Sequence, residues 1–334
     1  MFYEPCEGQA VQCGLCGHCC RIGPGERGVC QVRENRDGKL CALAYGLLLA
    51  MTPDPIEKKP LAHFQPGTRS LSIASAGCNL SCPWCQNYHL SDVVRRSGEI
   101  CGDFLPPEQV VAEAVARRCA SISYTYSEPT IHYEHNRATG VLARRQGLKN
   151  VFVTNGLMTV EAARDAARSF LDAANVDLKA MREETYKKLC KGPLASVLGC
   201  IRTLWEHGVW VEVTTLVIPG LNDSDEELRD TARFLLSVSP DLPWHLSRYH
   251  PDHRYDDAPP TPVETLQRAR STGLAAGLRH VYTGNVWGDE GEHTYCPSCG
   301  AIAIRRRGYQ AAATGMRGGK CTSCGAGIAG VQMP

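Results

Sequence analysis

The sequence of 334 residues carries almost no net charge, because 36 lysines and arginines stand against 35 aspartates and glutamates. A net charge of +1 gives no electrostatic basis for binding nucleic acid or membranes. A signal peptide is also missing, since residues 1–11, MFYEPCEGQAV, have neither a basic region nor an apolar core. The longest mostly apolar run, residues 40–51, is too short to span a bilayer. We therefore predict a cytoplasmic protein that does not insert into membranes.

The chain also lacks a glycine-rich dinucleotide fingerprint, internal repeats and low-complexity segments. Apolar, β-rich runs predict strands at Leu71–Ala74, Ser121–Tyr126, Asn150–Thr154, Ala174–Leu178, Val209–Ile218, Trp244–Tyr249 and His280–Tyr282. Helices are expected from Pro107 and over residues 130–146, 158–171, 182–206 in two pieces, 223–238 and 262–276. This alternation predicts an α/β fold, which we interpret as a partial (β/α) barrel with parallel strands. Its chemistry would lie at the C-terminal ends of the strands.

Cysteine, in contrast, is abundant, with 18 in the chain. Clustered cysteines in a reducing compartment bind metal more often than they form disulfides. Most of these cysteines fall into three clusters. We expect the isolated ones to be small buried hydrophobes, and these are Cys6, Cys41, Cys101, Cys119, Cys190 and Cys200.

The middle cluster, GCNLSCPWCQN at residues 77–87, holds three cysteines with C-x3-C-x2-C spacing, namely Cys78, Cys82 and Cys85. Structural and electron-carrying metal sites use four protein ligands, so three thiolates leave one metal position open. An open position is typical of a site where a substrate or cofactor binds the metal directly. The alternatives are a zinc site that takes a fourth ligand such as His89, or cysteines that only pack.

With an aromatic residue before its last cysteine, this motif resembles the signature of the radical S-adenosylmethionine (SAM) superfamily. The resemblance implies that Cys78, Cys82 and Cys85 are the catalytic ligands of a [4Fe–4S] cluster whose open iron chelates SAM. Reductive cleavage of SAM would then give methionine and a 5′-deoxyadenosyl radical that abstracts hydrogen from a substrate. Trp84 occupies the aromatic position that neighbours the adenine.

Segments at other expected strand ends resemble cofactor-binding parts of the same superfamily. YTYSEPT, residues 124–130, is similar to the GGEP-type segment that meets the methionine amino group, with Glu128 and Pro129 retained. Tyr126 and Ser127 replace its two glycines. A carboxylate beside an ammonium group is chemically sensible, although a loop carboxylate before a proline is the alternative.

Three later strand ends supply further candidates for cofactor binding. Asn155 in VFVTNG would bond ribose or carboxylate oxygens, unless it only forms a turn. Asp177 and Lys179 in VDLKA resemble the Asp-x-Lys pair of glycyl-radical-enzyme activases, and a local ion pair is the alternative. His250 follows the sixth strand in PWHLSRYHP, where the sequence does not separate its role from those of His245 and Arg248.

Across nearly its whole length the chain resembles the radical enzyme of the AmmeMemoRadiSam system, which is related to pyruvate formate-lyase activating enzyme. This resemblance rests on residues 13–40, on the two motifs above, and on TYCPSCG and GKCTSCG near the end of the chain. The chain departs from the family in having Gly17 where proline is common and in the doubled Cys19-Cys20. The resemblance implies Memo-like partner proteins and leaves the substrate open.

The two outer clusters predict separate metal modules. Residues 289–334 hold two C-x2-C knuckles typical of a zinc ribbon, with an iron–sulfur cluster as the rival, and the knuckles are Cys296, Cys299, Cys321 and Cys324. Residues 1–50 hold a second set that favours zinc, with an auxiliary iron–sulfur cluster as the alternative, and it comprises Cys13, Cys16, Cys20 and Cys30. Cys19 or His18 could substitute in that set. A connector at residues 51–66 leads to the barrel at residues 67–288.

We therefore predict a radical SAM oxidoreductase that takes electrons from reduced ferredoxin or flavodoxin. Its reaction would activate a partner protein by hydrogen abstraction from a glycine, or modify a small molecule or a side chain. RNA modification is disfavoured by the near-neutral charge, and we expect the ribbon's arginines, Arg305–Arg307, to form a solvated face. A pure electron-transfer protein is disfavoured by the open-site motif. The sequence leaves the oligomeric state and the fate of SAM open.

Overall fold

The computed structural model describes all residues from 1 to 334 and groups them into two compact units. Unit 1 comprises residues 1–53, 70–174 and 183–209. Unit 2 comprises residues 54–69, 175–182 and 210–334. The two units are therefore interleaved along the chain, and the domain boundaries expected from the sequence remain predictions.

Unit 1 is built on neighbouring strands in the spatial order β7 (Ala50–Pro55), β8 (Arg69–Ala74), β10 (Ser121–Tyr124) and β11 (Lys149–Thr154). The last three are parallel, since Ser72 pairs with Ser123 and Ser123 pairs with Val151. Nearly all their residues are buried, which is typical of parallel strands with covered faces. Their C-terminal ends consequently meet at one edge.

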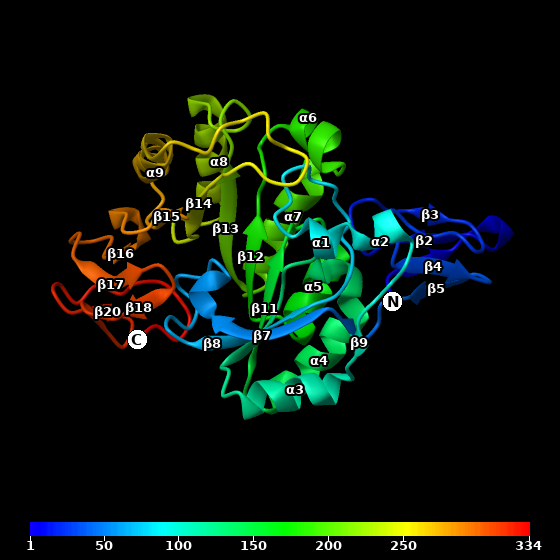
Figure 1. The fold of residues 1–334 in the computed structure, drawn as a ribbon. Helices are drawn as coiled ribbons and strands as arrows, with labels where there is room; N and C mark the ends of the chain where they lie inside the picture. Colours follow the sequence, from blue (N-terminus) through cyan, green and yellow to red (C-terminus); the bar gives the residue numbers. More distant parts are fainter. The chain divides into compact units, whose positions relative to one another are not determined.

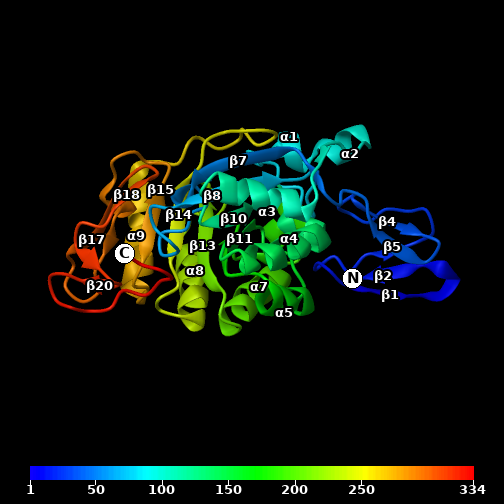
Figure 2. The same cartoon turned by 90° about the horizontal axis from the view of Figure 1, so that it is seen from below.

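Helices cover these strands on the side seen in Figures 1 and 2, where α3, α4, α5 and α7 lie beside β10 and β11. Their bounds are Pro107–Ala116, Tyr133–Arg145, Val160–Ser169 and Leu194–Glu206. α3 begins with Pro107, whose missing N–H costs nothing in the first turn. α5 is capped by the Thr159 side chain, which accepts a hydrogen bond from the Ala162 N–H, and it buries an alanine-rich face.

Short helical segments complete unit 1. They are α1 (Tyr88–Ser91), α2 (Val93–Ser97), a 3-10 turn at Pro129–His132, α6 (Glu183–Thr185) and a π-helical turn at Tyr186–Cys190. The first two directly follow the cysteine loop after β8, so that loop leads into helix rather than into open coil.

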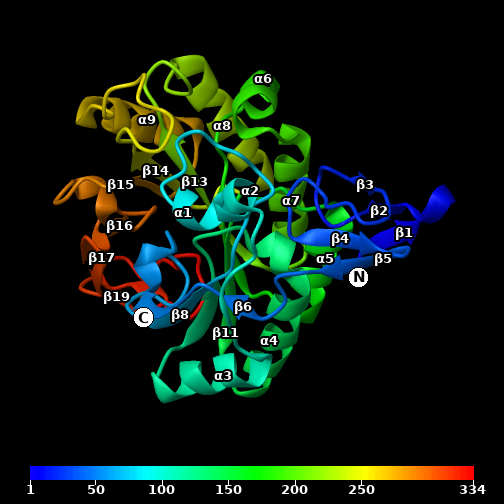
Figure 3. The same ribbon diagram turned by 45° about the vertical axis from the view of Figure 1, so that its right-hand side comes forward.

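The first 48 residues of unit 1 form small antiparallel sheets. These contain β1 (Tyr3–Pro5) with β2 (Val11–Cys13) and β3 (Arg21–Ile22), the hairpin of β4 (Arg33–Arg36) and β5 (Lys39–Ala42), and β6 (Leu47–Leu48) paired with β9 (Asp103–Phe104). Figure 3 shows β2 and β3 beside α5 and α7. Two contacts hold these small sheets against the helices. The Thr159 hydroxyl at the start of α5 donates to the Gly14 carbonyl after β2 at 2.8 Å, and Arg33 on β4 pairs with Glu134 on α4.

The segment expected to be an irregular connector begins with strand β7 and a 3-10 turn at Ile56–Lys58. β7 is antiparallel to β8, since the Leu49 N–H donates to Ala74 and the Ile56 N–H donates to Thr68. Its prolines, Pro53 and Pro55, favour a connector in the sequence. They are tolerated because β7 is an edge strand, where a missing N–H need not break a ladder bond.

Unit 2 contains the parallel strands β13 (Trp210–Val217), β14 (Trp244–Arg248) and β15 (Val281–Gly284), with helices α8 (Asp225–Val238) and α9 (Val263–Ala276). β12 (Ala173–Asp177) crosses the boundary between the units in sequence, and the residue after it, Leu178, donates its N–H to Thr214. Ser224 caps α8 by accepting from the Glu227 N–H.

The C-terminal part of unit 2 is a ribbon of short strands. A 3-10 turn at Glu290–Glu292 precedes β16 (Thr294–Tyr295), β17 (Ile302–Arg307), β18 (Gln310–Ala312), β19 (Met316–Arg317) and β20 (Lys320–Cys321). A small core of its own forms from Ala303, Ile304, Met316 and Ile328 together with Cys296 and Cys321. The ribbon therefore packs like a miniature domain around two of its cysteines.

A buried carboxylate connects residues 62–63 to the strands of unit 2. Glu212 on β13 is fully buried and accepts hydrogen bonds from the Ala62 and His63 N–H groups at 2.8 and 2.7 Å. It also accepts from the Trp210 indole at 3.0 Å and lies 2.6 Å from His245 Nε2. His63 in turn bonds the Ala329 carbonyl at 2.6 Å and the Tyr282 hydroxyl at 2.5 Å. A polar network thus replaces apolar packing at this place.

The α/β prediction is confirmed, and every expected strand is present as β8 and β10 to β15. Some residue-level expectations are wrong. Of the isolated cysteines, Cys119, Cys190 and Cys200 are buried as expected, whereas Cys101 is exposed and Cys6 and Cys41 are only partly buried. Arg306 is buried, because β17 alternates its faces and turns Arg306 inward to donate to the Ala62 carbonyl at 2.7 Å, while Arg305 and Arg307 stay exposed. None of the helices combines the length and apolarity needed to cross a bilayer.

Candidate active site

The loop after β8 brings the three central cysteines together. Cys78, Cys82 and Cys85 are each partly buried, and the Cys85 N–H donates to the Cys82 carbonyl at 3.3 Å. Burial raises the pKa of the Cys78 thiol, and the nearby Glu128 carboxylate and the Cys82 and Cys85 thiols raise it further. A bound metal would reverse this, because a cation stabilises the thiolates it binds.

Hydrogen-bond donors point at two of these sulfurs. The Leu80 N–H lies 3.4 Å from Cys78 Sγ, and the Asn155 side-chain amide lies 3.5 Å from it. Cys85 Sγ lies 3.2 Å from the Ser91 hydroxyl at the end of α1. Donors around a sulfur favour its anionic form, so this environment fits thiolate ligands.

Asn155 links the end of β11 to the cysteine loop. Its amide donates to the Asn79 side-chain oxygen at 2.8 Å, and its own oxygen accepts from the Leu157 N–H at 2.8 Å. Asn79 then donates to the Leu157 carbonyl at 3.1 Å. Because each amide group has a fixed partner, the Asn155 donor is held in place beside Cys78.

Glu128 is buried at the end of β10, and its carboxylate is already occupied. One oxygen accepts from the Thr130 N–H at 2.9 Å, the Thr130 hydroxyl at 2.5 Å and the Thr154 hydroxyl at 2.6 Å. The other accepts from the Asn155 N–H at 2.8 Å. Burial raises the pKa of Glu128, and these hydrogen bonds oppose the rise. The carboxylate therefore ties the end of β10 to the end of β11.

The backbone around Glu128 keeps the form expected of a glycine-containing segment. Tyr126, which stands where the resembling motif has glycine, has a φ of 67°, in the left-handed region that glycine adopts without strain. Pro129 begins the 3-10 turn that follows Glu128. The loop conformation is thus retained at the cost of a strained tyrosine.

Trp84 is buried, with 4% of its surface exposed. Two residues that the sequence analysis missed also hold the loop. Arg95 on α2 donates to the carbonyls of Cys78 and Leu80 at 2.6 and 2.8 Å, and His18 Nε2 lies 2.6 Å from the Asn79 carbonyl. Arg95 stands in no recognisable motif, and the sequence pointed to His18 only as a substitute ligand of the N-terminal set. Both act on main-chain oxygens, and such contacts cannot be read from a sequence.

The remaining cofactor candidates belong to unit 2. Lys179 Nζ lies 2.8 Å from the Asp177 carboxylate, so the pair forms the local ion pair that was one of the two expectations. His250 is exposed in the segment after β14. His245 and Arg248 have structural partners instead, namely Glu212 and the Thr261 carbonyl. The role of Asp177, Lys179 and His250 in cofactor binding therefore stays a prediction.

The C-terminal cysteines form a compact group with ligand atoms within 4.8 Å of one another. Cys296 Sγ lies 3.6 Å from Cys324 Sγ, and Cys299 Sγ lies 3.7 Å from Cys321 Sγ. Zn–S bonds of about 2.3 Å in a tetrahedron place the sulfurs about 3.8 Å apart, so the group fits one ion. Hydrogen bonds from the Cys324 and Ser323 N–H groups lower the pKa of Cys321 to about 6.

The two knuckles of the ribbon repeat the same turn. In the first, the Gly300 N–H donates to Cys296 and the Cys296 N–H donates to Ala301. In the second, Gly325 donates to Cys321 and Cys321 donates to Ala326. Gly300 and Gly325 have φ values of 73° and 76°, which explains why glycine follows each knuckle.

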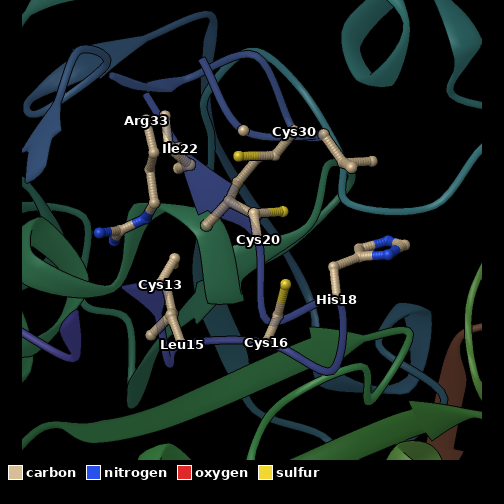
Figure 4. A pocket seen from close by; sticks show the side chains of 11 residues that line it. Cys13, Leu15, Cys16, His18, Cys20, Ile22, Cys30 and Arg33 are labelled. Atoms are coloured by element: carbon tan, nitrogen blue, oxygen red, sulfur yellow. The ribbon is translucent and has the colours of Figure 1, made fainter. Parts of the chain in front are cut away.

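The N-terminal cysteines surround a pocket, which Figure 4 shows from close by. Its walls include the four cysteines together with Leu15, His18, Ile22, Val29, Arg33 and Ile131. Of the doubled pair, Cys20 lines the pocket, whereas Cys19 is exposed and its thiol bonds the Cys16 carbonyl at 3.6 Å. The geometry thus separates two cysteines that the sequence left equivalent.

Known proteins agree with this arrangement. A model of the radical SAM superfamily matches residues 72–235, which include the cysteine loop. The uncharacterized protein MJ0808 of Methanocaldococcus jannaschii is 44% identical over 307 residues, covering 92% of this chain and 90% of its own. A GTP 3′,8-cyclase from Rhodopirellula baltica is 28% identical over 167 residues, and the match spans 48% of this chain and 45% of the cyclase.

A solved radical SAM methyltransferase from Sphaerobacter thermophilus shares the fold, with a TM-score of 0.52 at 20% identity, over 66% of this chain and 67% of that one. The family model covers the cysteine loop and the strand ends around it, and the archaeal relative matches nearly end to end. Residues 72–235 therefore form a radical SAM domain, and this domain identifies the chain as an enzyme.

Proposed function

We propose that this enzyme holds a [4Fe–4S] cluster on Cys78, Cys82 and Cys85 and uses it to start radical chemistry from SAM. The observation that carries the proposal is the set of three thiols on the loop after β8, with N–H donors aimed at Cys78. When bound, the cluster and SAM supply the reductive cleavage that yields methionine and a 5′-deoxyadenosyl radical. Membership of the superfamily supports both cofactors.

The chain's own residues would hold and shield this centre. Arg95 fixes the loop through two carbonyls, and Asn155 holds its amide beside Cys78. For Glu128 the occupied carboxylate supports a positioning role, because its hydrogen bonds set where Thr154 and Asn155 lie. Contacts of SAM with Trp84, Pro129, Asn155, Asp177, Lys179 and His250 remain part of the proposal.

The experiment is an anaerobic cleavage assay. The protein is reconstituted with iron and sulfide, reduced, and mixed with SAM, and 5′-deoxyadenosine and methionine are quantified. We expect both products from the wild type, none from Cys82→Ala, and wild-type yields from Cys101→Ala, which removes an exposed cysteine outside all three clusters. Product formation by Cys82→Ala at the control rate would refute the proposal.

For the ribbon we propose one structural zinc ion. The sulfur spacing supports a single tetrahedral ion. The assay that tests it is elemental analysis after purification without added metal. If the analysis found iron and sulfide at the ribbon in place of zinc, the ribbon would instead carry electrons.

We also propose the reaction's setting. Reduced ferredoxin or flavodoxin would supply the electrons, and the many free thiols support a reducing compartment such as the cytoplasm. We propose that the substrate is a partner protein of the AmmeMemoRadiSam type. More specifically, the enzyme would activate a glycine of that partner, and the Asp177–Lys179 pair supports this version. Electron paramagnetic resonance after mixing with a Memo-like partner tests it, since a glycyl radical gives a stable doublet.

A further inference from the structure

The N-terminal pocket has an unusual lining for a site with four thiols. Cys13, Cys16 and Cys30 are buried with less than 9% of their surface exposed, and Cys20 is half-buried. Apolar side chains fill the spaces between them, namely Leu15, Ile22, Val29 and Ile131. All four cysteines line the same pocket. In Figure 4 the sulfurs of Cys16, Cys20 and Cys30 lie around that space.

The ribbon of the same chain supplies an internal comparison. Its four sulfurs lie at contact distance, as one tetrahedral ion requires, and they enclose no room for anything larger. The N-terminal thiols instead stand around a pocket whose lining includes apolar side chains. A cube of iron and sulfide is larger than one ion, and its faces pack against apolar groups. A pocket walled by four cysteines and by apolar side chains therefore fits a cluster better than a single zinc ion.

A buried cation accompanies these thiols. Arg33 is 2% exposed and lines the same pocket as the four cysteines. Glu134 holds the guanidinium in place with a two-pronged ion pair. Four thiolates around a cluster leave a net negative charge, and an adjacent fixed cation reduces the cost of burying it.

The pocket lies directly against the loop that carries Cys78. A side chain at Gly77 would meet the Cys30 carbonyl at 3.5 Å and the Val32 side chain at 3.2 Å, so the segments that carry Cys30 and Cys78 approach each other closely. His18, which lines the pocket, bonds the Asn79 carbonyl at 2.6 Å. Arg95 donates to the Cys78 carbonyl at 2.6 Å.

We propose that Cys13, Cys16, Cys20 and Cys30 hold a second iron–sulfur cluster that passes single electrons to the centre at Cys78, Cys82 and Cys85. A reduced one-electron carrier protein would lose one electron to the N-terminal cluster. That cluster would then be reoxidised as the electron moves on to the loop after β8, so it is unchanged by a complete transfer. The relay rests on the proposed function, whereas the cluster itself does not.

The geometry gives this route an entrance and an exit. Val29, in the wall of the pocket, is 45% exposed, so the outer side of the site reaches the surface. The opposite side contacts Gly77 and Asn79. Electron tunnelling falls steeply with distance, and the hydrogen bond from His18 to the Asn79 carbonyl provides a short path. Arg95 on the Cys78 carbonyl places a positive charge beside the loop, where it offsets the repulsion of two negative centres.

Metal content tests the cluster. In anaerobically reconstituted wild type we expect about eight irons and about one zinc per chain, from two cubes and one ribbon ion. Cys13→Ala/Cys16→Ala should hold about half that iron, and Cys19→Ala, at the exposed neighbouring cysteine, should match the wild type. About four irons and about two zincs in the wild type would overturn the proposal.

A second variant keeps the test decisive if the double variant does not fold. Cys78→Ala/Cys82→Ala/Cys85→Ala leaves the N-terminal set intact and should retain about four irons with an iron–sulfur resonance signal after reduction. Loss of all iron from it would overturn the second cluster. If this variant holds iron but the wild type does not cleave SAM, the proposed function is rejected and the second cluster is still supported.

Electron delivery tests the relay. Cys13→Ala/Cys16→Ala should lose most of its flavodoxin-driven 5′-deoxyadenosine formation and keep the yield obtained with excess titanium(III) citrate, which reduces the catalytic centre directly. Equal losses with both reductants, or none with flavodoxin, would overturn the relay. Cys19→Ala serves as the matched control with both reductants.

Discussion

At the scale of single residues, the candidate site is organised by hydrogen bonds of the Asn155 amide, the Glu128 carboxylate and the Arg95 guanidinium, and most of their partners are main-chain groups. Asn155 stands at a strand end, where the fold predicts functional side chains, but its partners are Cys78 and Asn79 on another loop. The sequence shows that Asn155 ends a strand, but it does not show which residues its side chain contacts. The N–H···S contact is the feature with a measurable consequence, because hydrogen bonds to ligand sulfurs set cluster potentials.

Asn155→Asp should weaken the centre at Cys78. The substitution keeps the shape, removes the donor to Cys78 Sγ and places a carboxylate opposite the Asn79 oxygen. We expect a cost of about 1–3 kcal/mol in stability and a lower reduction potential, since added negative charge disfavours the reduced state. A potentiometric titration with iron analysis measures both. An unchanged potential would show that the amide does not act on the bound sulfur.

His63 is a second residue whose setting could not be predicted. It is fully buried, and burial lowers its pKa to about 4, while Glu212 and the Ala329 carbonyl oppose the shift. The Ala329 oxygen can only accept, so Nδ1 carries the proton and Nε2 accepts from Tyr282. Arg306 and His245 also face this ring and favour its neutral form.

This arrangement makes unit 2 sensitive to mild acid. The folded-state pKa lies below the ordinary 6.5, so the unfolded state binds the proton first and stability falls as pH drops from 6.5 towards 4. Between pH 7 and pH 5 the loss should be about 2 kcal/mol. His63→Gln should be less stable at pH 7 and lose less stability on acidification. Chemical denaturation of both proteins at the two pH values checks this, and equal pH dependence would contradict it.

At the scale of elements, the strands and helices followed from the sequence because apolar runs and capping residues report local structure. β7 did not, since its prolines argue against a strand unless its edge position is known. The loop at residues 16–18 shows a further limit. Gly17 faces Ser196 on α7, and a Cβ at this position would collide with the Ser196 side chain. The departure from proline noted in the sequence thus lies at a close contact with a distant helix.

Gly17→Ala should push this loop away from α7. We expect a destabilisation of about 1–3 kcal/mol from overpacking and a loss of metal from the N-terminal cysteines. Gly199→Ala, one turn further along α7, is the matched control, because its Cβ would meet Val160 at an ordinary 3.8 Å. That control should gain about 0.5–1 kcal/mol in helix stability. Thermal unfolding and metal analysis of the two variants give the comparison, and equal melting temperatures would show that the contact relaxes freely.

The ribbon should depend on its metal as an element. Cys321→Ala removes a buried ligand and leaves three, so we expect loss of about one zinc per chain and a lower melting temperature. Iron content should not change, because the cysteines of the other two clusters all belong to unit 1. Elemental analysis and calorimetry measure these effects. Full zinc occupancy in this variant would reject the assignment of the four ribbon cysteines as the zinc ligands.

At the scale of the whole molecule, the sequence predicted the α/β fold class and the grouping of the four C-terminal cysteines, whereas the place of the chemistry stays a prediction. It could not predict the interleaving of the two units. Residues 62–65 join the ribbon through His63 and Ala329, 266 positions apart, and through Gln65 and Val331. Such pairings have no periodicity, and only the folded chain reveals them. The buried Arg306 belongs to the same assembly, which is why a run of three arginines was misread as a surface.

These long-range bonds set an order for synthesis. All residues of unit 1 have been made once Val209 has left the ribosome, and they include the seven cysteines proposed to bind iron. The segment from Asp54 to Arg69 belongs to unit 2, and it cannot form its hydrogen bonds with residues near 330 until those residues have been synthesised. Because domains fold as their residues appear, iron could be loaded into a nascent chain long before zinc closes the ribbon. The two metals would then be inserted at different stages of the chain's production.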